Sequence, residues 1–320
     1  MLGHPVACGH YVDLKQSGFA IVFAAVKSST PTLTHIIQSQ GRGSVVAVTS
    51  LGDDVFVVRD NDQEQVEDEE VEDEEVEEEE GQVEVYDAVT LTLQRHIAVR
   101  GLGPHPTGVV ACGNNQCIYV SHNCGWIRTT STIHRVKLSG KNAVKQWCVA
   151  RGAAGLSVNV AHNLVVACQE AKKLQEYTTH GSLVREIRLH GVSSPLHAIQ
   201  LSTGDYVVSH NTSPGVVSVV GVYGHVIHSY GWSRTSDVGR MKKPSSLAVT
   251  RNNNILVADQ RNNRILSINR STGCVQELTL SVGYGMQQPV GLCLDESRGR
   301  LYVGEVGRQR LVLVFDNVNL

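Results

Sequence analysis

Short apolar runs separated by polar turns follow one another along most of the 320-residue chain. The two clearest copies of this pattern, residues 244–259 and 289–304, begin 45 residues apart. Each reads as an apolar strand, a tight polar turn and a second apolar strand, and a third strand follows at 264–268 or 310–315. The pattern therefore predicts antiparallel strands grouped in repeats.

Weaker copies of the same pattern lie upstream. They begin near residues 43, 106, 155 and 195, so the starts from 106 onward are roughly 40 to 50 residues apart, a spacing typical of blade-like repeats. Six such units, each too small to bury its own apolar faces, become stable when they pack side by side in a ring. We therefore predict an all-β fold: a six-bladed β-propeller of four-stranded antiparallel blades.

The last repeat supplies three strands, and an apolar segment ahead of the first repeat supplies a candidate for the fourth. Residues 33–37 are expected to form the outer strand of the last blade and to close the ring, which removes exposed sheet edges. The predicted organisation is an N-terminal arm at 1–32 followed by the propeller at 33–320.

One segment breaks the regular array. Residues 60–80 hold 15 acidic side chains and no basic one, and the strands that flank them are the second and third of the first repeat. Such a composition cannot bury a core, so we expect a disordered insert at 60–81. Without residues 60–80, 16 acidic residues face 28 Lys and Arg, a net charge of about +12, which favours an anionic partner. If the run competes with that partner for the basic surface, deletion of 62–80 will tighten binding.

Hydropathy and cysteine spacing bear on the cellular location and on metal binding. No apolar stretch reaches the 18 or more residues typical of a membrane span, so we expect a cytoplasmic monomer without membrane contact. The eight cysteines include no Cys-x-x-Cys pair, and metal binding is therefore not indicated by their spacing. We interpret them as buried thiols, with a Cys112 to Cys117 disulfide as the alternative.

Residues 255–265, Ile-Leu-Val-Ala-Asp-Gln-Arg-Asn-Asn-Arg-Ile, closely resemble an NHL repeat. The shared features are an apolar strand that ends in Asp259, then Asn262 and Arg264 before the next strand. The sixth repeat departs from the pattern, with Gly304 and Glu305 in place of Ala-Asp, and repeats one to four match in spacing and apolar pattern alone.

The resemblance is to the NHL propellers of tripartite-motif (TRIM-NHL) proteins, in which the propeller recognises RNA or protein and a RING domain elsewhere acts as the ubiquitin ligase. No RING, B-box or coiled coil is visible in this sequence. The resemblance therefore implies a non-catalytic binding module with a substrate-reading or scaffold role, bound to single-stranded RNA or to a protein. The alternative is a protein–protein adaptor associated with a ubiquitin ligase that binds no RNA.

Strand alternation places the loop between the second and third strands of every blade, and the loop to the next blade, at the same rim. Cations there would neutralise phosphates and aromatic rings would stack bases. Arg264 is expected to pair with Asp259 instead, and replacement of Arg240, Lys242 and Lys243 together is the test of RNA binding. The predicted binding face consists of Arg100, Trp126, Arg128, Arg151, Lys172, Lys173, Trp232, Arg234, Arg240, Lys242, Lys243, Arg261, Arg308 and Arg310.

Some six-bladed propellers are metal-dependent lyases or hydrolases, and this alternative remains open. His122 and His210 stand where the fifth repeat has Asp259, so both are candidate metal ligands. A zinc site needs three or four ligands, and no third repeat supplies a histidine there. We find no Gly-x-Ser-x-Gly or His-Glu-x-x-His motif, and we therefore assign no catalytic residue and no cofactor.

Overall fold

A computed structural model of the chain describes residues 30–38, 43–60, 81–123, 130–140, 143–231, 238–280, 285–307 and 310–318. Residues 61–80, the bulk of the acidic run, lie outside the described residues, so its predicted disorder and its competition with a ligand stay predictions.

Strands account for nearly all of the regular structure. In chain order the elements are β1 (Thr32–Ile37), β2 (Ser44–Leu51), β3 (Asp54–Asp60), β4 (Gln82–Asp87), β5 (Leu93–Ala98), β6 (Pro106–Cys112), β7 (Cys117–Asn123), β8 (Thr130–Lys137), β9 (Val144–Ala150), β10 (Ala153–Val158), β11 (Leu164–Cys168), β12 (Lys173–Tyr177), β13 (Leu183–Arg188), β14 (Pro195–Gln200), β15 (Tyr206–His210), β16 (Val216–Val220), β17 (Val226–Tyr230), β18 (Pro244–Val249), β19 (Ile255–Asp259), the 3-10 helix η1 (Gln260–Asn262), β20 (Arg264–Ile268), β21 (Val275–Glu277), β22 (Pro289–Asp295), β23 (Arg300–Glu305) and β24 (Val312–Asp316).

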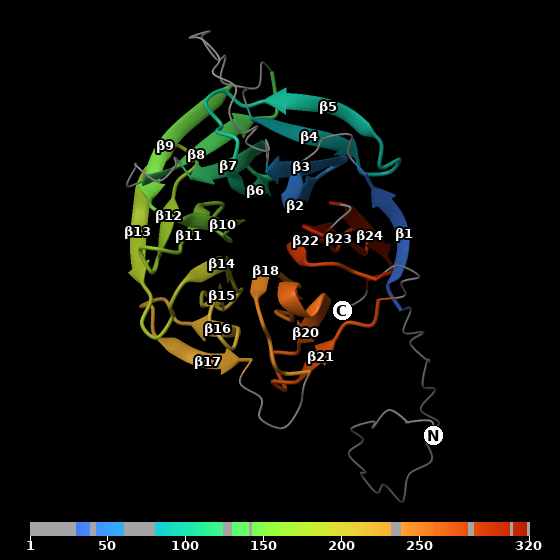
Figure 1. Ribbon diagram of the computed structural model, residues 1–320. Helices are drawn as coiled ribbons and strands as arrows, with labels where there is room; N and C mark the ends of the chain where they lie inside the picture. Colours follow the sequence, from blue (N-terminus) through green and yellow to red (C-terminus); the bar gives the residue numbers. More distant parts are fainter. Residues whose placement is uncertain are drawn as a thin grey trace, which may run out of the picture.

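The strands form six four-stranded antiparallel sheets arranged as blades around a central axis, as Figure 1 shows. Blades 1 to 5 are β2–β5, β6–β9, β10–β13, β14–β17 and β18–β21, and blade 6 is β22–β23–β24–β1. In each blade the first strand lies at the axis and the fourth at the rim. The predicted six-bladed β-propeller is confirmed.

The ring is closed by β1, which pairs antiparallel with β24 and so completes blade 6. Thr32 lies opposite Asp316 and Ile37 opposite Val312, and the Thr34 hydroxyl donates a hydrogen bond of 3.0 Å to the Asp316 carboxylate. The predicted closing strand at 33–37 is confirmed and begins one residue earlier, at Thr32.

The hydrophobic core lies between neighbouring blades. One cluster joins Phe56 and Val58 of blade 1 to Ile118 and Val120 of blade 2. Every residue of β11, β15 and β19 is buried, because the second strand of a blade has a neighbouring blade on both faces. No blade could bury this surface alone, so the fold depends on the complete ring.

Two further features of the described residues concern the cysteines and the helices. Cys112 and Cys117 are both free and buried, so the alternative of a disulfide between them is wrong. Cys168 is buried as expected, but Cys148 and Cys274 are exposed, because they lie on the outermost strand of a blade and in a turn, so the interpretation as buried thiols is wrong for these two. Within the described ranges, no helix is long and apolar enough to cross a membrane.

Candidate ligand-binding face and axial channel

In each blade, one residue at the end of the second strand lies opposite the first residue of the innermost strand. We call this the frame position. In blade 5 Asp259 lies opposite Pro244, and in blade 4 His210 lies opposite Pro195. The six residues at the frame position are Asp60, His122, Cys168, His210, Asp259 and Glu305.

The frame position marks the start of the loop between the second and third strands. That loop and the connection to the next blade lie at the same end of the antiparallel strands. We call this end of the propeller the loop face; it is the face that carries η1 in Figure 1.

Asp259 organises the loop face at blade 5. Its carboxylate is fully buried and accepts hydrogen bonds from the backbone N–H groups of Lys242 (2.9 Å) and Lys243 (3.3 Å), from Asn262 Nδ2 (2.6 Å) and from Arg264 Nε (3.1 Å). The Arg264 guanidinium also donates to the carbonyl oxygens of Val238 and Arg240. The predicted pair of Asp259 with Arg264 is confirmed, and it holds the loop that enters blade 5 against η1.

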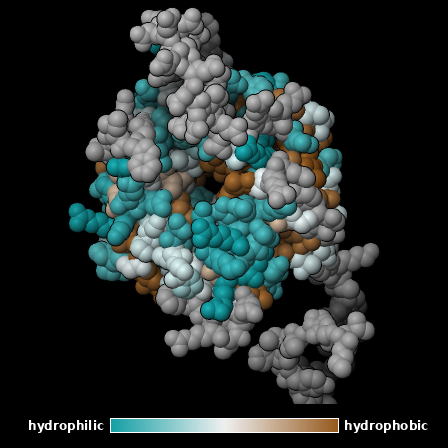
Figure 2. Space-filling view, in the orientation of Figure 1, coloured by the Kyte–Doolittle hydropathy of each residue, from teal (hydrophilic) through white to brown (hydrophobic). Residues whose placement is uncertain are grey.

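This framework forms one wall of a groove between blades 4 and 5, with a volume of about 1020 Å³. The opposite wall is the segment 211–214. Arg240, Lys242 and Arg261 line the groove with exposed side chains, and none of the three has an acidic partner within the part of the chain that is described. We call these three residues the groove cations. Figure 2 shows hydrophilic residues gathered on this face over β18 and β20, beside the central hollow.

The other predicted cations divide into exposed and paired ones. Arg100 and Lys172 are exposed on the same face. Arg151 and Lys173 instead form ion pairs, with Glu170 at 2.9 Å and with Glu186 at 2.5 Å. The backbone oxygen of Arg310 accepts a hydrogen bond of 2.8 Å from Arg59. The remaining predicted residues, Trp126, Arg128, Trp232, Arg234 and Arg308, lie outside the described residues.

The two candidate metal ligands occupy equivalent places in different blades, and blade 3 lies between them. His122 Nδ1 is 3.1 Å from Nε2 of His134, a fully buried residue of β8 that the sequence had not indicated. Burial first, and then the neighbouring His122, lower the pKa of His134 to about 4. Among the described residues, no three His, Cys, Asp or Glu side chains gather closely enough to hold a metal.

His210 and Glu305 show what burial does to a titratable group at the frame position. Nε2 of His210 has no hydrogen-bond partner in the described structure, and burial lowers the pKa of this imidazole to about 4. The Glu305 carboxylate accepts one hydrogen bond, of 2.6 Å, from the backbone N–H of Gln287. Burial raises the pKa of Glu305 to about 7. His210 is therefore neutral near neutral pH, and Glu305 is protonated in about half of the molecules there.

A second cavity, of about 760 Å³, runs between the six innermost strands, and we call it the axial channel. Each innermost strand carries a β-bulge immediately after its first residues, where the strand has one more residue than its partner. The extra residue lines the channel in every blade. The six bulge residues are Val46, Thr107, Ala154, Leu196, Ser245 and Val290.

Side chains of one blade bond to the innermost strand of the next at all six junctions. The Thr107 hydroxyl donates to the Ala153 oxygen (2.7 Å), and Ser50 Oγ lies 3.3 Å from Cys293 Sγ. The hydroxyl groups in these contacts are therefore already hydrogen-bonded to a neighbouring blade. The remaining junction bonds are Ala111 N to Thr49 Oγ1, Ser157 Oγ to Ala198 O, Ser209 Oγ to Ser245 O, Ser245 Oγ to Pro289 O and Leu292 N to Ser246 Oγ.

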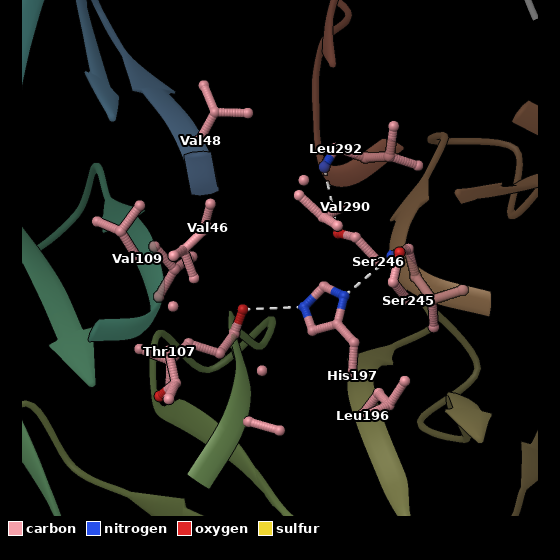
Figure 3. A pocket seen from close by; sticks show the side chains of 18 of the residues that line it. Val46, Val48, Thr107, Val109, Leu196, His197, Ser245, Ser246, Val290 and Leu292 are labelled. Carbon is pink, nitrogen blue, oxygen red and sulfur yellow. Dashed lines mark hydrogen bonds between the residues drawn. The ribbon is translucent and has the colours of Figure 1, made fainter. Parts of the chain in front are cut away.

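His197 spans three blades inside the channel, as Figure 3 shows. Its Nδ1 accepts a hydrogen bond of 3.0 Å from the Leu247 N–H of blade 5, and its Nε2 donates one of 3.0 Å to the Leu156 oxygen of blade 3. This pair of bonds requires the neutral imidazole, and burial lowers the pKa of His197 accordingly. Gly155 makes room for the ring, since a Cβ there would lie 2.7 Å from His197 Cδ2.

No protein-family model matches the sequence, and no curated protein matches it as a relative. Solved structures do match along most of the chain. An aldose sugar dehydrogenase from Streptomyces coelicolor, with bound PQQ, is 13% identical (TM-score 0.61; 90% of this chain and 98% of that one). A virginiamycin B lyase from Staphylococcus aureus is 10% identical (TM-score 0.56; 84% and 80%).

A third match is a protein of unknown function from Bacteroides thetaiotaomicron, 12% identical (TM-score 0.61; 86% of this chain and 69% of that one). At such low identities these likenesses show the propeller fold alone. The matched structures include enzymes and proteins of unknown function, so they do not decide whether this chain is an enzyme.

Proposed function

We propose that this chain is a non-catalytic, NHL-type propeller that binds single-stranded RNA on its loop face. One observation carries the proposal: Arg240, Lys242 and Arg261 line a single groove and have no acidic partner within the described residues. Cations left unpaired beside one another repel, so an anionic ligand that neutralises them binds favourably.

The rigidity of the groove supports a role in recognition. Asp259 and Arg264 fix the backbone of Lys242 and Arg240 through charge-assisted hydrogen bonds. The groove cations are therefore presented from an ordered frame, and little entropy is lost at their backbone on binding. The same residues carry the NHL resemblance, which connects the repeat pattern to the binding surface.

A polymer of phosphates fits this surface better than a single small anion. Further exposed cations, Arg100 and Lys172, lie on the same face in other blades, at separate points around the disc. Single-stranded RNA can follow such a path because its backbone is flexible and carries one charge per nucleotide. A protein partner, including one from a ubiquitin-ligase complex, is the competing occupant that the experiment must separate.

The test is a filter-binding titration of the full chain with a 20-nucleotide mixed-sequence RNA at two salt concentrations. Replacement of Arg240, Lys242 and Arg261 together by alanine should weaken binding about 10-fold or more at low salt. Three lost phosphate contacts should also make the slope of log K against log salt shallower by about 2. The matched control replaces Lys137, Lys145 and Arg251, which carry the same charge away from the loop face, and should change affinity less than about twofold.

Two results would overturn the proposal. If the wild-type chain binds no RNA at low salt, the RNA assignment fails and a protein partner is favoured. If the groove triple variant binds RNA as tightly as the control triple variant, RNA binding lies elsewhere on the molecule.

A further inference from the structure

The mouth of the axial channel is an apolar collar built by the six bulge residues. Four of them, Val46, Ala154, Leu196 and Val290, are aliphatic and line the cavity from different blades. Figure 3 shows Val46, Leu196 and Val290 around it. The other two, Thr107 and Ser245, already donate their hydroxyl protons to neighbouring blades, at 2.7 and 3.1 Å. A repeated bulge turns one side chain of every innermost strand toward the same opening.

Below the collar the channel has apolar side chains together with hydroxyl groups that are already bonded to the backbone of neighbouring blades, those of Thr49, Ser157 and Ser246. Val48, Val109 and Leu292 line this part of the channel, and both nitrogens of His197 are already bonded to neighbouring blades. An ordered water needs two to four free polar partners. A cavity of about 760 Å³ with such walls is within the size range of small-molecule sites, about 300 to 1,000 Å³.

Two charged residues lie among the described residues that line the channel, and they differ in their partners. The Asp60 carboxylate is 2.6 Å from His105 Nδ1. Lys243 is half-buried and has no acidic partner among the described residues. Its backbone N–H is bonded to Asp259, so the base of this side chain is fixed beside the collar. Burial, followed by the nearby Arg261 charge, lowers the pKa of Lys243, as expected for an ammonium group without a counter-ion.

We propose that the axial channel is a second binding site, separate from the RNA groove, for a small apolar molecule that carries one acid group. The apolar part fills the channel below the collar, and the acid group pairs with the Lys243 ammonium at the mouth. None of the groove cations lines the channel, so the apolar part of this site is separate from the RNA groove. The charge of Arg261 does reach Lys243, so the test below treats the acid group and the apolar part separately.

The test uses two fluorescent probes with the same ring system: 1-anilinonaphthalene-8-sulfonate, which carries an acid group, and N-phenyl-1-naphthylamine, which does not. The full-length chain should bind one molecule of the sulfonate saturably. Val290→Trp narrows the collar and should weaken both probes about 10-fold, a loss typical of a blocked pocket. Lys243→Met should weaken the sulfonate about 5-fold and leave the neutral probe within about twofold, because one partly exposed ion pair is lost.

The matched control for the collar is Val160→Trp, the same substitution at an apolar position that is 70% exposed in the loop between β10 and β11. It should leave both affinities unchanged. The groove triple variant should bind the neutral probe normally and should weaken sulfonate binding less than Lys243→Met does, since it removes only the neighbouring Arg261 charge, and Val290→Trp should still bind RNA. These two cross-checks separate a failure of this proposal from a failure of the RNA assignment.

A measurement on the wild-type chain keeps the proposal testable if Val290→Trp does not fold. Decanoate should displace the bound sulfonate probe about 10-fold better than decyltrimethylammonium, which has the same chain length and the opposite charge. Equal displacement by the two, or equal weakening of both probes by Lys243→Met, would overturn the acid-specific site. Equal binding by Val290→Trp and Val160→Trp, or no saturable binding at all, would overturn the channel site.

Discussion

Blades 4 and 5 have different residues at the frame position, and the two residues differ in their hydrogen bonds. In blade 5, Asp259 accepts four hydrogen bonds and ties the incoming loop to η1. In blade 4, His210 is equally buried, but its Nε2 has no partner in the described structure. Both blades nevertheless form the same four strands. The apolar strands alone are therefore enough to build a blade, and the acid at the frame position serves to hold the loops of the loop face.

The largest test of this difference is to remove the acid. Asp259→Ala removes the fully buried carboxylate that Arg264, Asn262 and two backbone N–H groups share, and leaves Arg264 with the more exposed Glu277 at 3.5 Å as its acidic partner. It should lower the free energy of unfolding by about 3–5 kcal/mol, because several donors around a buried site lose their acceptor at once. It should also weaken RNA binding, because the groove loop is released. Denaturant unfolding and filter binding measure the two effects.

Asp54→Ala is the matched control. It removes an aspartate from a largely exposed ion pair with Arg95 and should cost less than about 1 kcal/mol. A similar small cost for Asp259→Ala would show that the blade 5 framework adds nothing beyond an ordinary surface pair.

The second test uses acid to probe blade 4. The pKa of His210 in the folded chain is about 4, against 6.5 for a free imidazole. The unfolded state therefore takes up a proton at a higher pH, so stability is full above pH 6.5 and falls as the pH drops toward 4. The difference amounts to about 3 kcal/mol.

His210→Gln removes this titration. Its free energy of unfolding, measured in denaturant at pH 7 and at pH 4.5, should fall less than that of the wild-type chain over the same interval. If the wild-type chain and the variant lose the same stability, His210 is not the buried neutral group that the structure indicates.

The third and smallest effect concerns blade 6. Its frame position holds an acid, Glu305, as blade 5 does, but where Asp259 accepts four hydrogen bonds, Glu305 accepts one, from a backbone N–H. Its pKa is raised from 4.5 to about 7, so its contribution to stability is full below pH 4.5 and is lost as the pH rises through 7. Glu305→Gln keeps the acceptor for Gln287 and should stabilise the chain at pH 8 by about 1–3 kcal/mol, with a smaller gain at pH 5. Thermal unfolding at the two pH values checks the sign, and destabilisation at pH 8 would contradict it.

Strand pattern and repeat spacing were sufficient to predict the ring, its six blades and its closing strand. These features follow from local apolar periodicity, which the sequence contains directly. The pair of Asp259 with Arg264 was also predictable, because both residues belong to one short motif.

The paired cations and the axial channel were not predictable in the same way. Glu186, which neutralises Lys173, lies on the next strand and comes close through strand pairing. The bulge residues share a place in the backbone rather than a residue type, so no sequence pattern marks them. His197 likewise gains its role from two strands of other blades, Leu156 and Leu247.

The closing strand has a consequence for synthesis on the ribosome. The hydroxyl of Thr34 reaches the Val314 oxygen across 280 positions of the chain, so β1 emerges first and its partner β24 last of all the strands. Until β24 has left the exit tunnel, blade 6 has no edge on which β1 can pair. The nascent chain must therefore carry an unpaired apolar segment through nearly the whole of translation, a period in which a chaperone that covers residues 32–37 would delay ring closure without hindering the earlier blades.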